Sequence, residues 1–503
     1  MKPSAVAALA GVLALAGCTP GPNYRQPSAP VPPAFKEQPP PNFKEAQGWK
    51  QAQPNDGQLK GKWWEIYNDP ELNALEEQVA ITNQNVLQAE AQYREAKAAV
   101  LIVRSGLFPT LSAGPSITES RSEAGSTSSA AAAASGLHTF YSLPISASWE
   151  PDLWGNIRRS VTAATAQAQT SAADMENARL LYESELAQDY FTLRGLDGDI
   201  ELLTRTAKSY SEYLVLTRNR FAGGVASDLD VAQAESQLYA AQTQLVDFGV
   251  ARAQMEHAIA VLTGKPPAQV SVSGKILKTP PPPVPIALPS QLLERRPDIA
   301  ANERLVAAAN EQIGIAKAAF FPSLALAATA GFQASRITTW LSWPSRFFSA
   351  GPTMAETIFD AGRRRAQVNQ NLAAYDAAVA AYRQSVLTAF QQVEDSLSTL
   401  RVLADESVVA DQSVKSADRA LEVSTEQYRA GTTAYLTVLT AQATALAAEK
   451  TQIDLLARRL EASVQLVVSL GGGWDTSQLP TKQDIVKAAS PSQAAAAPPA
   501  KTP

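Results

Sequence analysis

Two long stretches of this sequence contain no proline, and they restrict the fold more than any other feature. One runs from residue 152 to 265 and the other from 353 to 479. Both are rich in Ala, Gln, Glu, Leu and Arg, which favour helices. Glycine lies near the middle of each stretch, at Gly223-Gly224 and at Gly431. The pattern predicts two helical hairpins, whose first helix is about 100 Å long at ~1.5 Å per residue.

The predicted hairpins cover residues 155–265 and 361–470. After each glycine break, apolar residues recur alternately every three and every four positions. Sustained spacing of this kind is typical of a left-handed coiled-coil seam, and the many alanines in it indicate closely packed helices. Arg252 and Lys450 interrupt the two seams, and the sequence alone gives no account of either.

The two halves of the chain resemble each other. Residues 107–111 resemble 320–324, and the segment that begins at Gly224 resembles the one that begins at Gly431. Matches in a fixed order at a nearly constant offset indicate duplication of a unit. A stiff linker with four consecutive prolines joins the halves. We therefore predict a first repeat, a Pro-rich linker and a second repeat at residues 63–278, 279–289 and 290–474.

Each repeat also contains two segments with the alternation of a half-buried β-strand. Tyr141, Leu143 and Ile145, for example, alternate with mostly polar neighbours. Each segment has about 10–13 residues, which at ~3.3 Å per residue and a tilt near 45° spans roughly 25–30 Å of hydrocarbon. The predicted strands cover approximately residues 107–119, 139–150, 321–333 and 347–359.

Four strands per chain cannot close a membrane barrel, for which about eight are needed. Unpaired backbone groups are not tolerated in lipid, because no water is present to satisfy them. If the strands cross a membrane, the protein is therefore an oligomer. Two copies would supply eight strands around a filled interior, and three would supply twelve strands with room for a pore.

The N-terminus has the pattern of a secretory signal that ends at a lipid attachment point. Its apolar run is too short to span a bilayer. It ends at residues 15–18, Leu-Ala-Gly-Cys, which resemble the bacterial lipobox, where the cysteine thiol accepts a diacylglycerol. We predict a signal peptide over 1–17, lipid attachment at Cys18 and an extended lipoprotein segment over 18–62. Thr19 replaces the aspartate that retains lipoproteins in the inner membrane, so the outer membrane is the expected destination. The alternative is an ordinary signal peptide cut nearby.

Composition argues against several other classes of protein. The net charge is −5, which gives no electrostatic reason for nucleic acid as a partner. One cysteine and two histidines leave no basis for a disulfide framework or a metal centre. We see no catalytic constellation, and we expect no cofactor apart from the covalent lipid on Cys18. Residues 475–503, which end in a low-complexity stretch of Ser, Pro and Ala, are predicted to be a disordered tail.

Several motifs occur together in one order. They are residues 17–24 (GCTPGPNY), 63–72 (WWEIYNDPEL), 295–299 (RRPDI) and 358–364 (IFDAGRR), with Phe-Pro at 108–109 and 321–322. With this set the chain resembles the outer-membrane factors of the TolC type, in particular the NodT branch of lipoproteins that serves resistance-nodulation-division efflux systems. The resemblance covers residues 17 to about 474.

The resemblance implies a mainly α fold with membrane β-structure. The expected assembly is a homotrimer whose 12-stranded outer-membrane β-barrel, with four strands per chain, stands on a long periplasmic α-barrel of coiled-coil helices. Helix tips close the end that is distant from the membrane, and an equatorial collar surrounds the α-barrel.

By the same resemblance, the two glycine breaks are periplasmic tips that meet the hairpin of an adaptor. The alternative is that they are only turns. The predicted adaptor-binding residues are Gly223, Gly224, Val225, Ala226, Ser227, Gly431, Thr432 and Thr433.

The expected gate differs from the family pattern. Family members often carry aspartates just past the second tip, where this chain has Thr437 and Thr440. Tyr428 and Arg429 are retained as candidate closing residues. Asp228 and Asp230 at the first tip either face the lumen as an acidic ring or are acids favoured at a helix start. The ion selectivity of the gate is therefore open.

We predict an outer-membrane exit duct of a tripartite efflux pump that passively exports small molecules such as drugs or toxic compounds, and no enzymatic activity. The implied partners are further copies of the chain, a periplasmic membrane-fusion adaptor, an inner-membrane resistance-nodulation-division transporter and outer-membrane lipid, without nucleic acid. One alternative is an exit duct for type I protein secretion. Another is a periplasmic coiled-coil structural lipoprotein that forms no pore.

Overall fold

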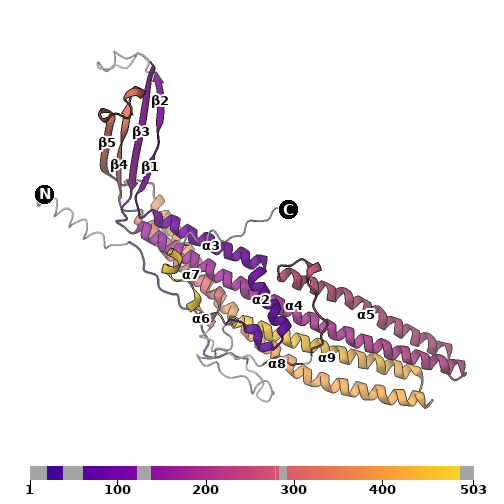
Figure 1. Ribbon diagram of the computed structural model, residues 1–503. Coiled ribbons are helices and arrows are strands. Elements are labelled where there is room, and N and C mark those ends of the chain that lie inside the picture. Colours follow the sequence, from indigo (N-terminus) through magenta and orange to yellow (C-terminus); the bar gives the residue numbers. More distant parts are fainter. Residues whose placement is uncertain (1–19, 38–60, 122–136, 278, 283–291, 488–503) are drawn as a thin grey trace.

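The chain forms an elongated molecule with a β-sheet at one end and long helical hairpins that reach the other (Figure 1). The computed structural model describes residues 20–37, 61–121, 137–277, 279–282 and 292–487. The predicted signal peptide, Cys18 and most of the predicted linker lie outside the described residues. In the described part of the chain, no helix is both long enough and apolar enough to cross a membrane.

The strands form one antiparallel sheet with four strand positions. Their bounds are β1 (Thr110–Ala113), β2 (Ser116–Arg121), β3 (Leu137–Trp149), β4 (Ser323–Ala334) and β5 (Arg346–Ala355). The order is β1-β3-β4-β5, and β2 pairs with a second part of β3. The first strand position is broken at Gly114-Pro115, because proline cannot donate a hydrogen bond to the ladder. The strand expected over 347–359 ends earlier, at Ala355.

In the described part of the chain, the six longest helices form three pairs of equal length. The first repeat has α3 (Gln84–Ser105), α4 (Asn156–Ala222) and α5 (Asp228–Leu262), and the second has α7 (Pro297–Ala318), α8 (Arg363–Arg429) and α9 (Tyr435–Ser469). The lengths are 22, 67 and 35 residues in both repeats. Shorter turns are η4 (Pro267–Gln269), α6 (Leu292–Arg295), η6 (Ile337–Thr339) and η7 (Trp343–Ser345).

The helix α4 is the centre of the helical part. It packs against α3 and α5 of its own repeat and against α7 and α9 of the second, while α8 packs on α7 and α9. Small side chains permit this close approach, since Ala163, Ala166, Ala168 and Ala172 of α4 are all buried. The two outer flanks of the layer are therefore α8 on one side and α3 with α5 on the other.

The charges that interrupt the coiled-coil seams have specific partners on α4. Arg252 donates from Nε to Asp197 Oδ1 at 2.7 Å and from Nη2 to the Val272 carbonyl at 2.8 Å. Lys450 donates to Asp199 at 3.1 Å and to Asp454 at 2.8 Å. At both interruptions, therefore, the cation of the returning helix pairs with an aspartate of α4.

In each repeat, the end of the returning helix is bonded in the same way to the start of the repeat's 22-residue helix. Asn83 caps α3 and donates to the carbonyl of Leu262, and Arg296, just before α7, donates to the carbonyl of Ser469. Gly264 and Gly471 follow these carbonyls with positive φ angles of 69° and 97°. This geometry pairs Gly264 of the first repeat with Gly471 of the second.

Residues 63–82 and 270–276 form a layer on one face of α4, which we call the collar. It contains η3 (Trp63–Tyr67) and α2 (Pro70–Thr82). Arg194 of α4 is 1% exposed and fixes the collar through Glu71 at 2.7 Å and the carbonyl of Ser273. It also bonds to Asp197 of its own helix at 2.9 Å. Trp63 is completely buried in the same layer.

Both ends of the described chain also pack on the helices. Residues 20–37 contact α7 and α8, where the backbone N–H groups of Lys36 and Glu37 donate to Glu394. The prediction of a disordered tail over 475–503 is wrong for its first part. That part forms η8 (Thr476–Gln478) and α10 (Lys482–Val486), and Ile485 is fully buried against α3 and α4. An apolar side chain in an otherwise low-complexity segment supplies this contact.

Candidate functional site at the helix tips and in the helical wall

The two hairpin tips have the same backbone turn. Gly224 and Gly431 have φ angles of 72° and 76°, a left-handed conformation that glycine adopts without steric cost. The N–H of Val225 returns to the carbonyl of Arg220 at 2.8 Å, and the N–H of Thr432 returns to that of Gln427 at 2.9 Å. These bonds satisfy carbonyl groups at the ends of α4 and α8.

The acids at the first tip serve the start of α5. Asp230 accepts from the backbone N–H of Ser227 at 2.9 Å, and the Ser227 hydroxyl accepts from the N–H of Asp230 at 3.2 Å. This reciprocal pair is a capping box. Asp228 is exposed in the first turn of the same helix. The geometry favours the helix-start interpretation for Asp230.

Tyr428 lies inside the tip rather than on its surface. It is 4% exposed and packs in one apolar cluster with Ala234, Leu238 and Val438. Its ring lies 5.5 Å from that of Tyr435. Arg429 behaves differently, since it is exposed and pairs with Glu426 of its own helix at 3.0 Å. The two candidate closing residues therefore do not act together within one chain.

Arg220 joins the two tips, and sequence reasoning missed it. Its Nη1 donates to the Tyr428 carbonyl at 2.6 Å, and its guanidinium lies 4.5 Å from the centre of the Tyr428 ring. A cation over an aromatic face is attracted by the ring quadrupole. The sequence carried no signal for this contact, because an arginine in the last turn of a helix is common for dipole reasons alone.

The remaining predicted tip residues are accessible or bonded locally. Thr433 donates to Thr437 at 3.2 Å, and Thr440 donates to the carbonyl of Leu436 on its own helix. Ala226 and Thr433 are half-buried, whereas Gly223, Ser227 and Thr432 are exposed. Exposed apolar side chains surround them, namely Val225 at 69%, Leu229 at 64% and Leu436 at 58%.

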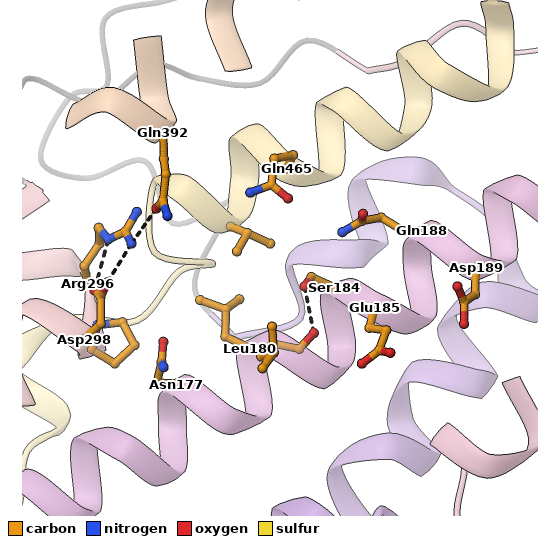
Figure 2. Close-up of a pocket in the computed structure, with 13 residues that line it drawn as sticks. Asn177, Leu180, Ser184, Glu185, Gln188, Asp189, Arg296, Asp298, Gln392 and Gln465 are labelled. Carbon is orange, nitrogen blue, oxygen red and sulfur yellow. Dashed lines mark hydrogen bonds and ion pairs between the residues drawn. The ribbon is translucent and has the colours of Figure 1, made fainter. Parts of the chain in front are cut away.

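A polar pocket of about 610 Å³ lies in the helical wall between α4, α8, α9 and the start of α7 (Figure 2). Arg296 spans its rim through Asp298 at 2.6 Å and Gln392 at 2.8 Å. Glu185 and Asp189 line the α4 side. Burial, together with the charges of Glu185 and Glu461, raises the pKa of Asp189 to about 6. In the residues that the structure describes, no group of three or more His, Cys, Asp or Glu side chains is placed to hold a metal ion.

Comparison with known proteins identifies the family. The family model described as "Outer membrane efflux protein" matches residues 75–265 and 288–472, which is most of both repeats. This chain belongs to that family.

Individual relatives agree with this membership. The pyoverdine export outer membrane protein OpmQ of Pseudomonas aeruginosa is 31% identical over 83% of this chain and 88% of that protein. The toluene efflux pump outer membrane protein TtgF of Pseudomonas putida is 30% identical over 92% of this chain and 95% of that protein. The solved structure of the outer-membrane channel OprN matches with a TM-score of 0.80 and 30% identity, over 91% of this chain and all of that one.

These findings confirm the main sequence predictions. The chain is an outer-membrane exit duct of a tripartite efflux system, with the fold of the TolC-like channels, and it is not an enzyme. The recognition of the outer-membrane factors from motifs is confirmed, while the finer assignment to the NodT branch stays a prediction. The alternative of a periplasmic coiled-coil lipoprotein that forms no pore does not agree with this family membership.

Proposed function

We propose that three copies of this efflux protein close into one duct. The observation that carries the proposal is the open sheet. β5 and the broken β1–β2 strand are its two edges, and neither pairs with a further strand among the described residues. Backbone groups at such edges need partners inside a membrane. Three copies of four strand positions give a barrel of twelve strands, which is wide enough for a pore.

The helical flanks support the same assembly. Val246 and Val250 of α5 are 75% and 57% exposed, and Val402 and Val409 of α8 are 51% and 69% exposed. These side chains lie on the two outer flanks of the layer, where more than half of each side chain is exposed among the described residues. Joining α8 of one copy to α5 of the next would bury both sets, at about 25 cal/mol for each Å² removed from water.

Edge-to-edge cross-linking tests the assembly. One cysteine replaces Ser112 of β1, and a second replaces Ser349, Gly351 or Thr353 of β5. On oxidation, at least one of these pairs should produce dimers and trimers. Cys18 is the only native cysteine, so the background is small. Ser146 and Thr329 are direct partners in neighbouring central strands, so cysteines there should cross-link within one chain. Only monomers from every edge pair, with a monomeric native mass, would contradict the trimer.

We infer that the tips dock a periplasmic adaptor. The support is the pattern of small and exposed apolar residues around Gly224 and Gly431, with Val225, Leu229 and Leu436 accessible. Val225→Asp and Leu436→Asp should weaken co-purification of the adaptor. Val215→Asp is an equally exposed apolar site on α4 below the tip and should have less effect. Equal losses at all three sites would contradict a tip-centred contact.

We infer that the cargo is small molecules. The support is that relatives of nearly full length are named for the export of pyoverdine and of toluene. Deletion of the gene should sensitise cells to such compounds without changing the set of secreted proteins. Loss of a secreted protein, with unchanged compound sensitivity, would favour the type I secretion alternative.

The lipid on Cys18 is part of the same proposal. Its support is the lipobox pattern at the position of the single cysteine. Cys18→Ala should abolish incorporation of labelled palmitate. Unchanged incorporation in that variant would exclude Cys18 as the attachment point.

A further inference from the structure

Two glutamates are enclosed between the collar and α4, and neither lines the polar pocket described above. Glu76 of α2 is completely buried, and Glu183 of α4 is 5% exposed. Among the described residues, neither carboxylate oxygen of Glu76 has a hydrogen-bond partner. Glu183 accepts one bond, from the indole Nε1 of Trp63 at 3.2 Å. A buried ionised carboxylate without a partner is very costly, so this site favours a neutral Glu76.

The surrounding elements supply little compensating charge. On α4, the nearest cation to Glu183 is Arg179, but its Nη1 is bonded to both oxygens of Glu176, at 3.1 and 3.0 Å. From η3, the Tyr67 hydroxyl bonds with Ser463 of α9 at 2.8 Å. The buried Arg459 lies one turn before Ser463 on α9.

The remaining charged groups nearby face water. Glu77, the neighbour of Glu76 on α2, is 51% exposed and pairs with Lys62, which precedes η3. Neither group is enclosed with the pair. Within the described part of the chain, Glu183 therefore accepts a bond from Trp63, and the carboxylate of Glu76 is buried without a hydrogen bond.

This environment raises the pKa of both glutamates. Burial raises the pKa of Glu76 well above its ordinary value of 4.5, and the charge on Glu183 raises it further. Burial also raises the pKa of Glu183, to about 7, although the bond from Trp63 and the charge of Arg179 act in the opposite direction. Interacting carboxyl groups release protons as a pair rather than singly.

We propose that Glu76 and Glu183 form a proton-binding site that holds the collar on α4. With a proton bound, the pair carries at most one negative charge and α2 stays packed. Loss of the proton places two negative charges in one enclosed space, and local detachment of residues 63–82 then relieves their repulsion by exposing Glu76 to water.

The direction of the pH effect follows from proton linkage. In the detached state Glu76 has its ordinary pKa, so above about pH 5 the packed state holds more protons than the detached one. A rise in pH therefore favours detachment, by up to about tenfold in the opening equilibrium for each pH unit. The effect levels off once the packed pair has lost its proton.

Hydrogen–deuterium exchange of the purified full-length protein tests the site. The readout is the opening equilibrium of peptides from residues 63–82 between pH 5.5 and 8.5, corrected for the intrinsic pH dependence of exchange. The wild type should open increasingly as pH rises. Glu76→Gln keeps the shape of the side chain without the charge, so its opening should depend less steeply on pH, with Glu183 as the remaining titrating group.

Two further variants make the result decisive. Glu77→Gln removes an exposed acid one residue away and should keep the wild-type slope. Glu183→Gln retains an acceptor for Trp63 and should also reduce the slope, which preserves the test if Glu76→Gln does not fold. A flat wild-type profile, or Gln variants that keep the wild-type slope, would overturn the proposal.

Discussion

At the scale of single residues, Arg194 fixes the collar to the helices. Its side chain is 1% exposed and is bonded to two carboxylates and a backbone carbonyl. Arg194→Ala leaves Asp197 with one fewer cation in a buried setting, so we expect a loss of about 3–5 kcal/mol in collar stability. Arg205→Ala, also on α4, removes a more exposed pair with Glu449 of α9 and should cost less than about 1 kcal/mol. Exchange protection of residues 63–82 measures both, and equal effects would contradict the assigned role.

A second prediction at this scale concerns Gly471. A Cβ atom there would lie 2.0 Å from the carbonyl oxygen of Arg295, and φ is 97°. Gly61 has a similar φ of 93° with nothing within 4 Å of the same position. Gly61→Ala should therefore cost about 1–2 kcal/mol from backbone strain alone. Gly471→Ala should cost clearly more, as measured by the thermal unfolding midpoint, and a smaller loss at Gly471 would contradict the close contact.

Residue contacts were the part of the structure that the sequence predicted least. Arg252 and Lys450 were recognised as interruptions, but their partners Asp197 and Asp199 lie on another helix, far away in the chain. The sequence did not predict the role of Arg220, since its contact with Tyr428 depends on how two separate hairpins pack. The sequence also did not predict the burial of Glu76, because burial of a single acid leaves no periodic pattern in its neighbours.

At the scale of elements, the hairpin tips are tied together by Arg220. Arg220→Ala removes the bond to the Tyr428 carbonyl and the contact with its ring, so α8 and α9 should separate more easily from α4 and α5. We expect more frequent openings in single-channel recordings. Arg218→Ala removes an exposed pair with Glu235 near the same tip and should change little. Fewer openings in the Arg220 variant than in the wild type would contradict this role.

Elements were largely predictable because their signals are local and periodic. Seams of 3.5-residue spacing gave the long helices, and positive-φ glycines gave the tips. The strand signal was coarser: the break at Gly114-Pro115 was missed, and the last strand was drawn too long. The tail was misjudged because composition dominates a short segment, whereas one side chain, Ile485, determines its packing.

At the scale of the whole molecule, a single chain leaves strand edges unpaired and apolar surfaces uncovered. Its sheet has two open edges and its helical layer has two apolar flanks, which are the features a closed ring of copies removes. The sequence predicted this incompleteness from strand count alone. The way in which copies fit together depends on side chains that meet only in the assembly.

The most direct test of the account is planar-bilayer conductance of the purified protein, with the native mass taken from the same sample. We predict a trimer that gives small, flickering currents, which is the behaviour expected of a duct that its helix tips hold nearly closed. The Arg220→Ala variant should give larger or more frequent currents at the same mass. A monomer or dimer without conductance, in both wild type and variant, would contradict a duct formed by three copies.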